Sequence, residues 1–454
     1  MLQKHGTMHV SFRRCLGLMA FAAAAMLLVG NAAWAKEGKN DRAVRLLATV
    51  PIPGTAANTA GGNMYVFDIS WVDQPSRTYY LADRSNAAVD IVDTETNILM
   101  AQLQAGFKGF TGTNGTSGPN GVVTGGHCLF VTDAPSRVVS FDTSVFPPKM
   151  VSAVLTASGD LNRADEEAYD PADGVVLAIN NADDPPFGTF ITVNKSTCAL
   201  TQPTAPAPGV AAPDRILFNT AAGVNATNGA EQPVWDPATG RFYLSIPQIG
   251  LNASSGGVVR INPTTGKIEQ TFPISFCSPA GLAKGPNNDF LVGCNTVFDT
   301  AGGLWSQTDA KTAAPIQVIL NVKTGNVDQV GGVGVGDEVW FNSGDGNYYT
   351  ASSTSPLRPL DLSGPADAQG AAILGVIDSR DEEVLQLVPT FNGAAVTGTG
   401  AHPASTAHSV AADARNNRIF VPLGANNVFP DCLTGCIAVY WHGDEDEPGR
   451  VALP

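Results

Sequence analysis

A short motif recurs seven times along this chain: an apolar run that ends in a tight turn. The turns fall at Asp73, Gly125, Asp170, Asp236, Gly285, Asn342 and Asp413. The residues five positions before them, nearly all polar, are Asp68, Asn120, Asp165, Glu231, Ala280, Asp337 and His408. A fixed period of roughly 20 to 50 residues, or a little more, is typical of repeat proteins. We therefore expect seven equivalent structural units.

Each unit is predicted to contain four short antiparallel strands. In the first unit, apolar stretches at 67–73, 78–82, 87–92 and 97–103 are separated by turn-forming clusters. The 48 glycines, 31 prolines and only 15% charged residues fit many short strands, and helical spacing is nowhere sustained. Four antiparallel strands per unit in a radial arrangement form a β-propeller blade. The sequence therefore predicts an all-β, seven-bladed β-propeller.

The two ends of the repeat region are expected to complete each other. The seventh unit offers only three strand-like segments, at 409–412, 418–422 and 436–441. The stretch 44–50 is strand-like but belongs to no unit. Pairing it with the last unit would close the ring and hide the exposed strand edges. We treat residues 36–454 as a single propeller domain.

The first 35 residues have the pattern of a bacterial signal peptide. Basic residues precede an apolar stretch over 15–29, and an A-x-A site predicts cleavage after Ala35. The apolar stretch is too short for a membrane span, and nothing later resembles one. The formal net charge of −15 disfavours nucleic acids and anionic membranes as partners. We expect an exported monomer, periplasmic or secreted.

Six cysteines remain after the signal peptide, an even number that suits an oxidising compartment. Cys277 and Cys294 lie about equally far from one turn and would face each other across a hairpin. Cys432 and Cys436 enclose three residues of one loop. Cys128 and Cys198 form the remaining pair by elimination. None of these spacings matches a metal or haem motif, so we expect structural disulfides.

Equivalent positions of a closed repeat form a ring, so the polar residues before the turns should meet around one axis. They are Asp68, Asn120, Asp165, Glu231, Asp337 and His408. Four converging carboxylates repel one another unless some are protonated or a cation lies among them. Oxygen ligands predict Ca²⁺ or Mg²⁺, and His408 would also admit Zn²⁺ or Mn²⁺. The alternative is that these side chains only hydrogen-bond strand ends and channel water.

Residues beside the ring positions receive separate interpretations. The acidic and amide residues next to them, expected to form hydrogen bonds between blades, are Glu166, Glu167, Gln232 and Glu338. Glu167, two residues after Asp165, is also kept as a candidate general base. His402 is interpreted as a solvated loop residue, and His127 belongs to the opposite face. The tryptophans expected to pack between blades, rather than form a ligand platform, are Trp71, Trp235 and Trp340.

Two segments, 118–122 and 231–244, resemble sequences of two related propeller groups. One is the gluconolactonase/senescence-marker family of six-bladed lactone hydrolases with calcium or zinc on the axis. The other is the YncE-like group of exported seven-bladed propellers. In the lactonase family, a Glu before Pro-x-Trp and an Asn in an Asn-Gly turn ligate the metal, and Glu231 and Asn120 match these positions. Seven units here depart from the six of that family, so its other ligands do not transfer.

The sequence predicts a periplasmic propeller that binds a divalent cation or a small polar ligand in its axial funnel, without covalent chemistry. A metal-dependent, lactonase-type hydrolase is the alternative that the resemblance implies. A third possibility is a scaffold that binds another protein through its outer loops. The sequence contains no nucleophile elbow, zinc-protease helix motif, P-loop or dinucleotide fingerprint.

Overall fold

The computed structural model describes residues 43–305, 316–355, 371–390 and 408–441. These residues form antiparallel sheets and no α-helix, with two 3-10 turns, η2 (Asn114–Thr116) and η3 (Thr220–Ala222). Within the described ranges, no helix is long and apolar enough to cross a membrane. The predicted signal peptide lies outside them.

Three sheets contain four strands each, joined in chain order. The first consists of β2 (Ser70–Asp73), β3 (Thr78–Asp83), β4 (Ala88–Asp93) and β5 (Ile98–Leu103). The second consists of β6 (Val122–Gly125), β7 (Cys128–Asp133), β8 (Arg137–Asp142) and β9 (Lys149–Leu155). The third consists of β23 (Gly336–Asn342), β24 (Asn347–Ser355), β25 (Ala371–Asp378) and β26 (Val384–Pro389).

Two larger sheets lie between these in the sequence. The five-stranded sheet consists of β10 (Glu167–Asp170), β11 (Val175–Asn180), β12 (Phe187–Asn194), β13 (Ala199–Leu200) and β14 (Arg215–Leu217). The first half of the eight-stranded sheet consists of β15 (Pro233–Asp236), β16 (Arg241–Ile246), β17 (Ser255–Asn262) and β18 (Lys267–Ser275). Its second half consists of β19 (Cys277–Lys284), β20 (Asp289–Val297), β21 (Ile316–Asn321) and β22 (Val327–Gly331). A single parallel bridge, Ser255 to Cys277, joins the halves.

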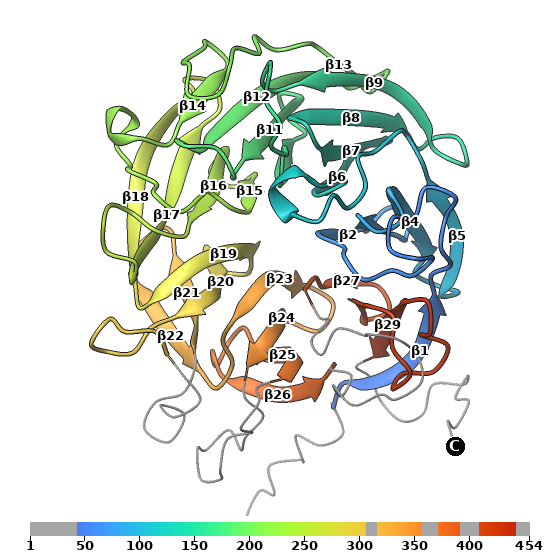
Figure 1. Ribbon diagram of the computed structural model, residues 1–454. Coiled ribbons are helices and arrows are strands. Elements are labelled where there is room, and N and C mark those ends of the chain that lie inside the picture. The colour runs from blue at the N-terminus through green and yellow to red at the C-terminus, as the bar shows by residue number, and fades with distance from the viewer. Residues whose placement is uncertain (1–42, 306–315, 356–370, 391–407, 442–454) are drawn as a thin grey trace, which may run out of the picture. The chain divides into compact units, whose positions relative to one another are not determined.

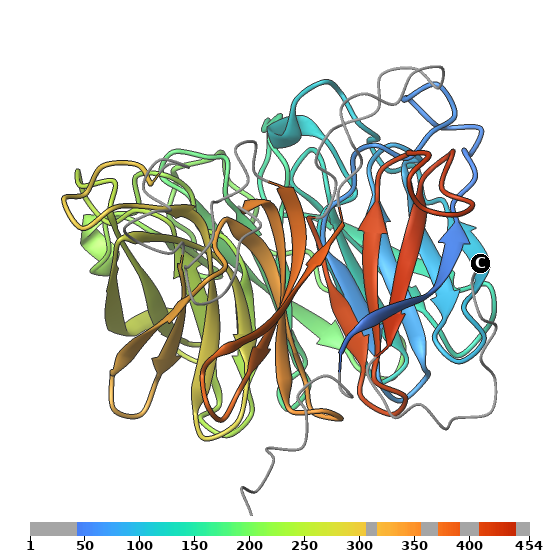
Figure 2. The ribbon, with the colours of Figure 1, turned by 90° about the horizontal axis from the view of Figure 1, so that it is seen from below.

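The remaining sheet unites the two ends of the described chain. It consists of β27 (Ala411–Asp413), β28 (Arg418–Leu423), β29 (Cys436–Trp441) and β1 (Arg45–Pro51). β1 pairs antiparallel with β29, from Arg45 opposite Trp441 to Pro51 opposite Cys436. Figure 2 shows β1 in blue beside the red strands of this sheet. The expected pairing of the N-terminal strand with the last unit is therefore confirmed.

Four of the seven turns that define the sequence motif are Asx turns. Carboxylate or amide oxygens of Asp170, Asp236, Asn342 and Asp413 accept backbone N–H groups two residues later, at 2.8 to 3.1 Å. Such side chains satisfy the backbone of a tight turn themselves. They end the first strand at the same point in each of these sheets, which fixes the register of the residues before them.

The first strands of successive sheets are neighbours. β2 contacts β6, and the series continues through β10, β15, β19 and β23 to β27, which contacts β2 again. Figure 1 shows these strands around a common centre, here called the axis, with later strands farther out. The core lies between neighbouring sheets: Tyr80 and Val89 pack in one cluster with Leu129 and Val139 of the next sheet.

Candidate functional site

Backbone hydrogen bonds hold the predicted ring residues at equivalent places. The N–H groups of Asp68, Asn120, Asp165 and Glu231 each donate to a carbonyl of the following strand, at 2.7 to 3.0 Å. Because these bonds occur at the same position in four sheets, the side chains gather at one end of the axis.

His408 links two of the predicted carboxylates. Its Nε2 lies 3.0 Å from Asp68 Oδ1, and its Nδ1 lies 3.0 Å from Asp337 Oδ2. The imidazole is about a third exposed, whereas Asp68 is buried. His408 therefore bridges the first sheet to the sheet of β23.

Two arginines that the sequence analysis missed lie among these carboxylates. Arg84 is 2% exposed; it forms an ion pair with Asp68 and donates from Nε to Asn120 Oδ1 at 2.9 Å. Arg163 donates to Asp165 Oδ2 at 2.7 Å, and its Nη1 lies 3.6 Å from Asp68 Oδ2. The converging negative charges are therefore matched by guanidinium groups of the chain itself.

Asparagines complete the arrangement. Asn181 donates to Glu231 Oε2 at 3.3 Å, and Asn295 donates to Asp337 Oδ1 at 3.0 Å. Asn295 lies beside the ring position that carries Ala280, which has no polar group. We call the whole set the charged network; it comprises Asp68, Arg84, Asn120, Arg163, Asp165, Asn181, Glu231, Asn295, Asp337 and His408.

The network shifts the pKa of its members in opposite directions. Burial alone would raise the pKa of Asp68, but Arg84, His408 and Arg163 outweigh it and hold the pKa below its usual range. Burial raises the pKa of Asp165 to about 6 and, with help from Asp165 and Asp337, that of Glu231 to about 8. Burial would lower the pKa of His408, but Asp337 and Asp68 raise it well above its usual value.

These contacts already offset much of the repulsion between the carboxylates that a bound metal ion would otherwise have to offset. Three cationic side chains face three aspartates, and Glu231, with a pKa of about 8, is mostly protonated at neutral pH. Among the described carboxylates of the network, Asp165 keeps one buried oxygen without a hydrogen bond, and Arg84 lies 3.8 Å from it. The oxygen ligands expected for Ca²⁺ or Mg²⁺ are thus already engaged by side chains.

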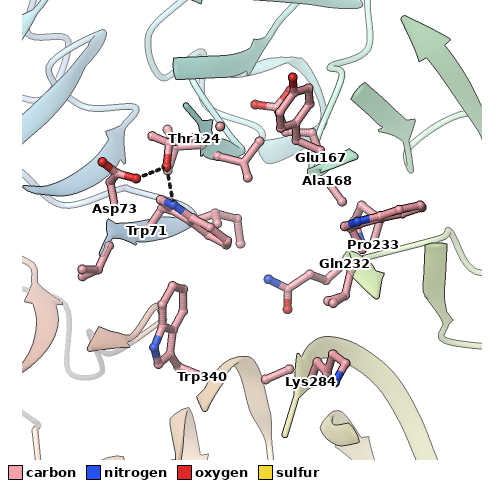
Figure 3. Close-up of a pocket in the computed structure, with 18 of the residues that line it drawn as sticks. Trp71, Asp73, Thr124, Glu167, Ala168, Gln232, Pro233, Lys284 and Trp340 are labelled. Atoms are coloured by element: carbon pink, nitrogen blue, oxygen red, sulfur yellow. Dashed lines mark hydrogen bonds between the residues drawn. The ribbon is translucent and has the colours of Figure 1, made fainter. Parts of the chain in front are cut away.

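A cavity of about 490 Å³ occupies the other end of the axis. Six of the first strands line it: β2, β6, β10, β15, β19 and β23. Exposed turn residues, including Pro75, Gly126 and Pro171, form its rim. Figure 3 shows the Gln232 side chain reaching toward the middle of this cavity. This volume is within the range of small-molecule sites.

The tryptophans do more than the sequence analysis expected. Trp71, Trp235 and Trp340 do pack against the cores between sheets, as predicted. All three also line the cavity, and the rings of Trp71 and Trp340 meet edge to face with centroids 5.1 Å apart. Trp71 Nε1 donates to Thr124 Oγ1 at 2.8 Å, which holds its ring in place.

Two of the four residues assigned to contacts between sheets do form them. Gln232 Oε1 accepts the N–H of Leu282 at 2.6 Å, and Glu338 Oε2 accepts the N–H groups of Ser70 and Val410. For Glu166 and Glu167 the prediction is wrong. Neither carboxyl receives a hydrogen bond from the described residues, although both side chains are more than nine-tenths buried.

The other predicted residues are placed as follows. Both carboxyl oxygens of Glu167 are buried in the lining of the cavity, and burial raises its pKa well above the usual value; its role as a general base stays a prediction. His402 lies outside the described residues. His127 lies beside the disulfide of Cys128 and Cys198, whose sulfurs bond each other and offer no thiolate.

The three disulfides join the expected pairs: Cys128 with Cys198, Cys277 with Cys294, and Cys432 with Cys436. Three such bonds fit a secreted or periplasmic protein.

Comparisons with known proteins assign no family. No model of a protein family matches the chain, and no curated relative matches it.

Proposed function

We propose that this protein is an exported, seven-bladed β-propeller that binds a small ligand in its axial cavity without covalent chemistry. The cyclic order of neighbouring first strands, from β2 through β27, supports the seven-bladed arrangement. The pairing of β1 with β29 supports its closure by the N-terminal strand. The disulfides support export.

One observation carries the binding function: the cavity is formed by six of the inner strands, β2, β6, β10, β15, β19 and β23, and contains polar groups at its inner end. Glu166 and Gln232 lie there, where the cavity approaches the charged network. A largely apolar cavity with a few convergent polar groups is the usual form of a small-molecule site. The charged network closes the opposite end of the axis.

Metal-dependent hydrolysis of lactones has less support. Of the two residues that match lactonase ligands, Asn120 uses its oxygen for Arg84 and its nitrogen for the Ala164 carbonyl, at 2.9 and 2.7 Å. Glu231 is held by Asn181 and is mostly protonated at neutral pH. A divalent ion would have to displace the arginines from their carboxylates.

The proposal is tested by filling the cavity. Ala168, which lines it, is replaced by Phe, and wild type and Ala168→Phe are screened against a panel of charged and neutral solutes. Tryptophan fluorescence and melting temperature report binding. We expect solutes that bind the wild type and not the variant. A panel without a single binder, or binders that the variant retains at equal affinity, would contradict a ligand site in the cavity.

A further inference from the structure

We propose that the cavity binds an organic cation: an ammonium group on a small apolar body, with Glu166 as its counter-ion and Trp71 and Trp340 as aromatic walls. This inference rests on the proposed function, because it names the class of ligand for the same cavity.

Glu166 is a carboxyl without a partner. It lines the cavity, is 9% exposed, and receives no hydrogen bond from the described residues. Buried polar groups in native proteins are nearly always hydrogen-bonded, so an orphaned carboxyl calls for an explanation. A bound cation would supply the missing partner.

Charged groups of both signs act on Glu166. The guanidinium of Arg163 favours its ionised form, and the carboxyl groups of Asp165, Glu231, Glu338 and Asp68 act against it. Together they oppose a negative charge on Glu166 while the cavity is empty. A cation placed beside Glu166 favours the ionised form of its carboxyl, because opposite charges attract.

The tryptophans supply the second half of the recognition. Indole is the best aromatic partner for a cation, and an ammonium group gains most where water is excluded. Trp71 is fixed by its bond to Thr124, and Trp340 meets it edge to face, so both rings are held before a ligand arrives. Preorganised walls lower the entropic cost of binding.

The rest of the lining selects against a strongly polar ligand. Most of the lining side chains are apolar, among them Val122, Val234, Leu282 and Val339. The charged groups at the rim have partners of their own: Lys284 Nζ lies 3.5 Å from Asp236, and Asp73 accepts the hydroxyl of Thr124. A sugar, which needs many hydrogen bonds, finds few here.

Choline and its neutral carbon isostere, 3,3-dimethylbutan-1-ol, form the test. The two probes share shape and hydroxyl group and differ in the charge on the branched centre. Titration of the full chain, followed by tryptophan fluorescence and calorimetry, should give an affinity for choline about tenfold or more above that for the alcohol. Equal affinities, or binding of uncharged solutes alone, would overturn the cation while leaving the cavity as a ligand site.

Substitutions in the cavity show whether recognition of choline depends on its charge or only on its shape. Glu166→Gln should lose the preference for choline, and the control Glu95→Gln, at an exposed residue outside the cavity, should keep it. Trp340→Leu should weaken choline more than the alcohol, which provides a second measurement if Glu166→Gln folds poorly. Unchanged choline affinity in both Glu166→Gln and Trp340→Leu would overturn the proposal. If no solute of either kind binds, the proposed function fails as well.

Discussion

The two ends of the axis are built on largely the same set of inner strands, and they differ in how many of their charged groups have partners. At one end, nearly every carboxyl group forms an ion pair or a hydrogen bond with an arginine, a histidine or an asparagine. At the other, Glu166 is buried without a hydrogen bond, and indole rings line an open volume. The charged network, whose groups form hydrogen bonds and ion pairs with one another, contributes to the stability of the fold. The cavity contains a carboxyl group without a hydrogen bond, so a ligand that pairs with this group gains binding free energy.

The sharpest way to break this comparison is to remove Arg84. Arg84→Met leaves the buried Asp68 without its nearest guanidinium partner, which should cost about 3–5 kcal/mol in the free energy of unfolding. Urea unfolding measures the change. The control is Arg77→Met, which removes an exposed pair with Glu95 and should have little effect. Equal losses in both variants would mean that the charged network does not stabilise the fold.

The next effect concerns the cavity and pH. Burial, with the carboxyl groups of Asp165, Glu231, Glu338 and Asp68, raises the pKa of Glu166 well above its usual value, so a bound cation must displace a proton. Choline affinity should therefore rise by up to about tenfold per pH unit below that raised pKa. Affinity for 3,3-dimethylbutan-1-ol should stay flat. Calorimetry at several pH values checks this, and parallel profiles would contradict it.

The stabilising contribution of His408 to the charged network should fall as pH rises, whereas choline affinity should increase with pH. The pKa of His408 is raised in the folded state, so its contribution is fully present below its unfolded pKa of about 6.5 and is lost as pH rises through the folded value. The difference in melting temperature between wild type and His408→Gln should be largest in mildly acidic buffer and smaller in alkaline buffer. His127→Gln is the control. A difference that grows with pH would contradict the ion pairs of His408.

A smaller effect concerns the free energy of unfolding, which should depend on Glu166 in a different way than on the residues of the charged network. Because the pKa of Glu166 is raised, the folded state holds its proton more tightly than the unfolded state, and this costs stability as pH rises above about 4.5. Glu166→Gln should therefore leave stability unchanged in acid and raise it, by about 1 kcal/mol or more, in alkaline buffer. Urea unfolding at the two pH values measures this. A loss at both would show that Glu166 has a structural partner.

The smallest expected effect is that of a chelator. Because Arg84, Arg163 and His408 already face the carboxylates, we expect no change in melting temperature when the purified protein is treated with EDTA. Elemental analysis accompanies the measurement. A stoichiometric divalent ion, and a melting temperature that falls with its removal, would restore the metal site that the sequence predicted.

Much of the fold follows from local chemistry. The Asx turns at Asp170, Asp236 and Asp413 recur because a carboxylate can satisfy its own turn, and this recurrence revealed the repeat. The end-to-end pairing was predictable because the 44–50 stretch had no other strand to join. The gathering of the ring residues follows from the same register.

The side chains that pair with the ring carboxylates are less evident from the sequence. Arg84, Asn181 and Asn295 occupy one equivalent position, two residues after the second-strand residue opposite each ring position, so a wider alignment would have found them. Arg163 lies in a loop and carries no such signal. The cavity depends on which side chains leave space at the axis, and spacing in a sequence does not encode that.

Because β1 pairs with β29, the sheet that contains both strands forms only after both segments have been synthesised. In a growing chain, β1 is made long before β29, its partner along that edge among the described residues. Contacts between distant segments slow folding, and unpaired strand edges invite association with other chains. During synthesis, β1 therefore stays unpaired along this edge until β29 is made, and a protein that shields extended segments would have that whole interval in which to act.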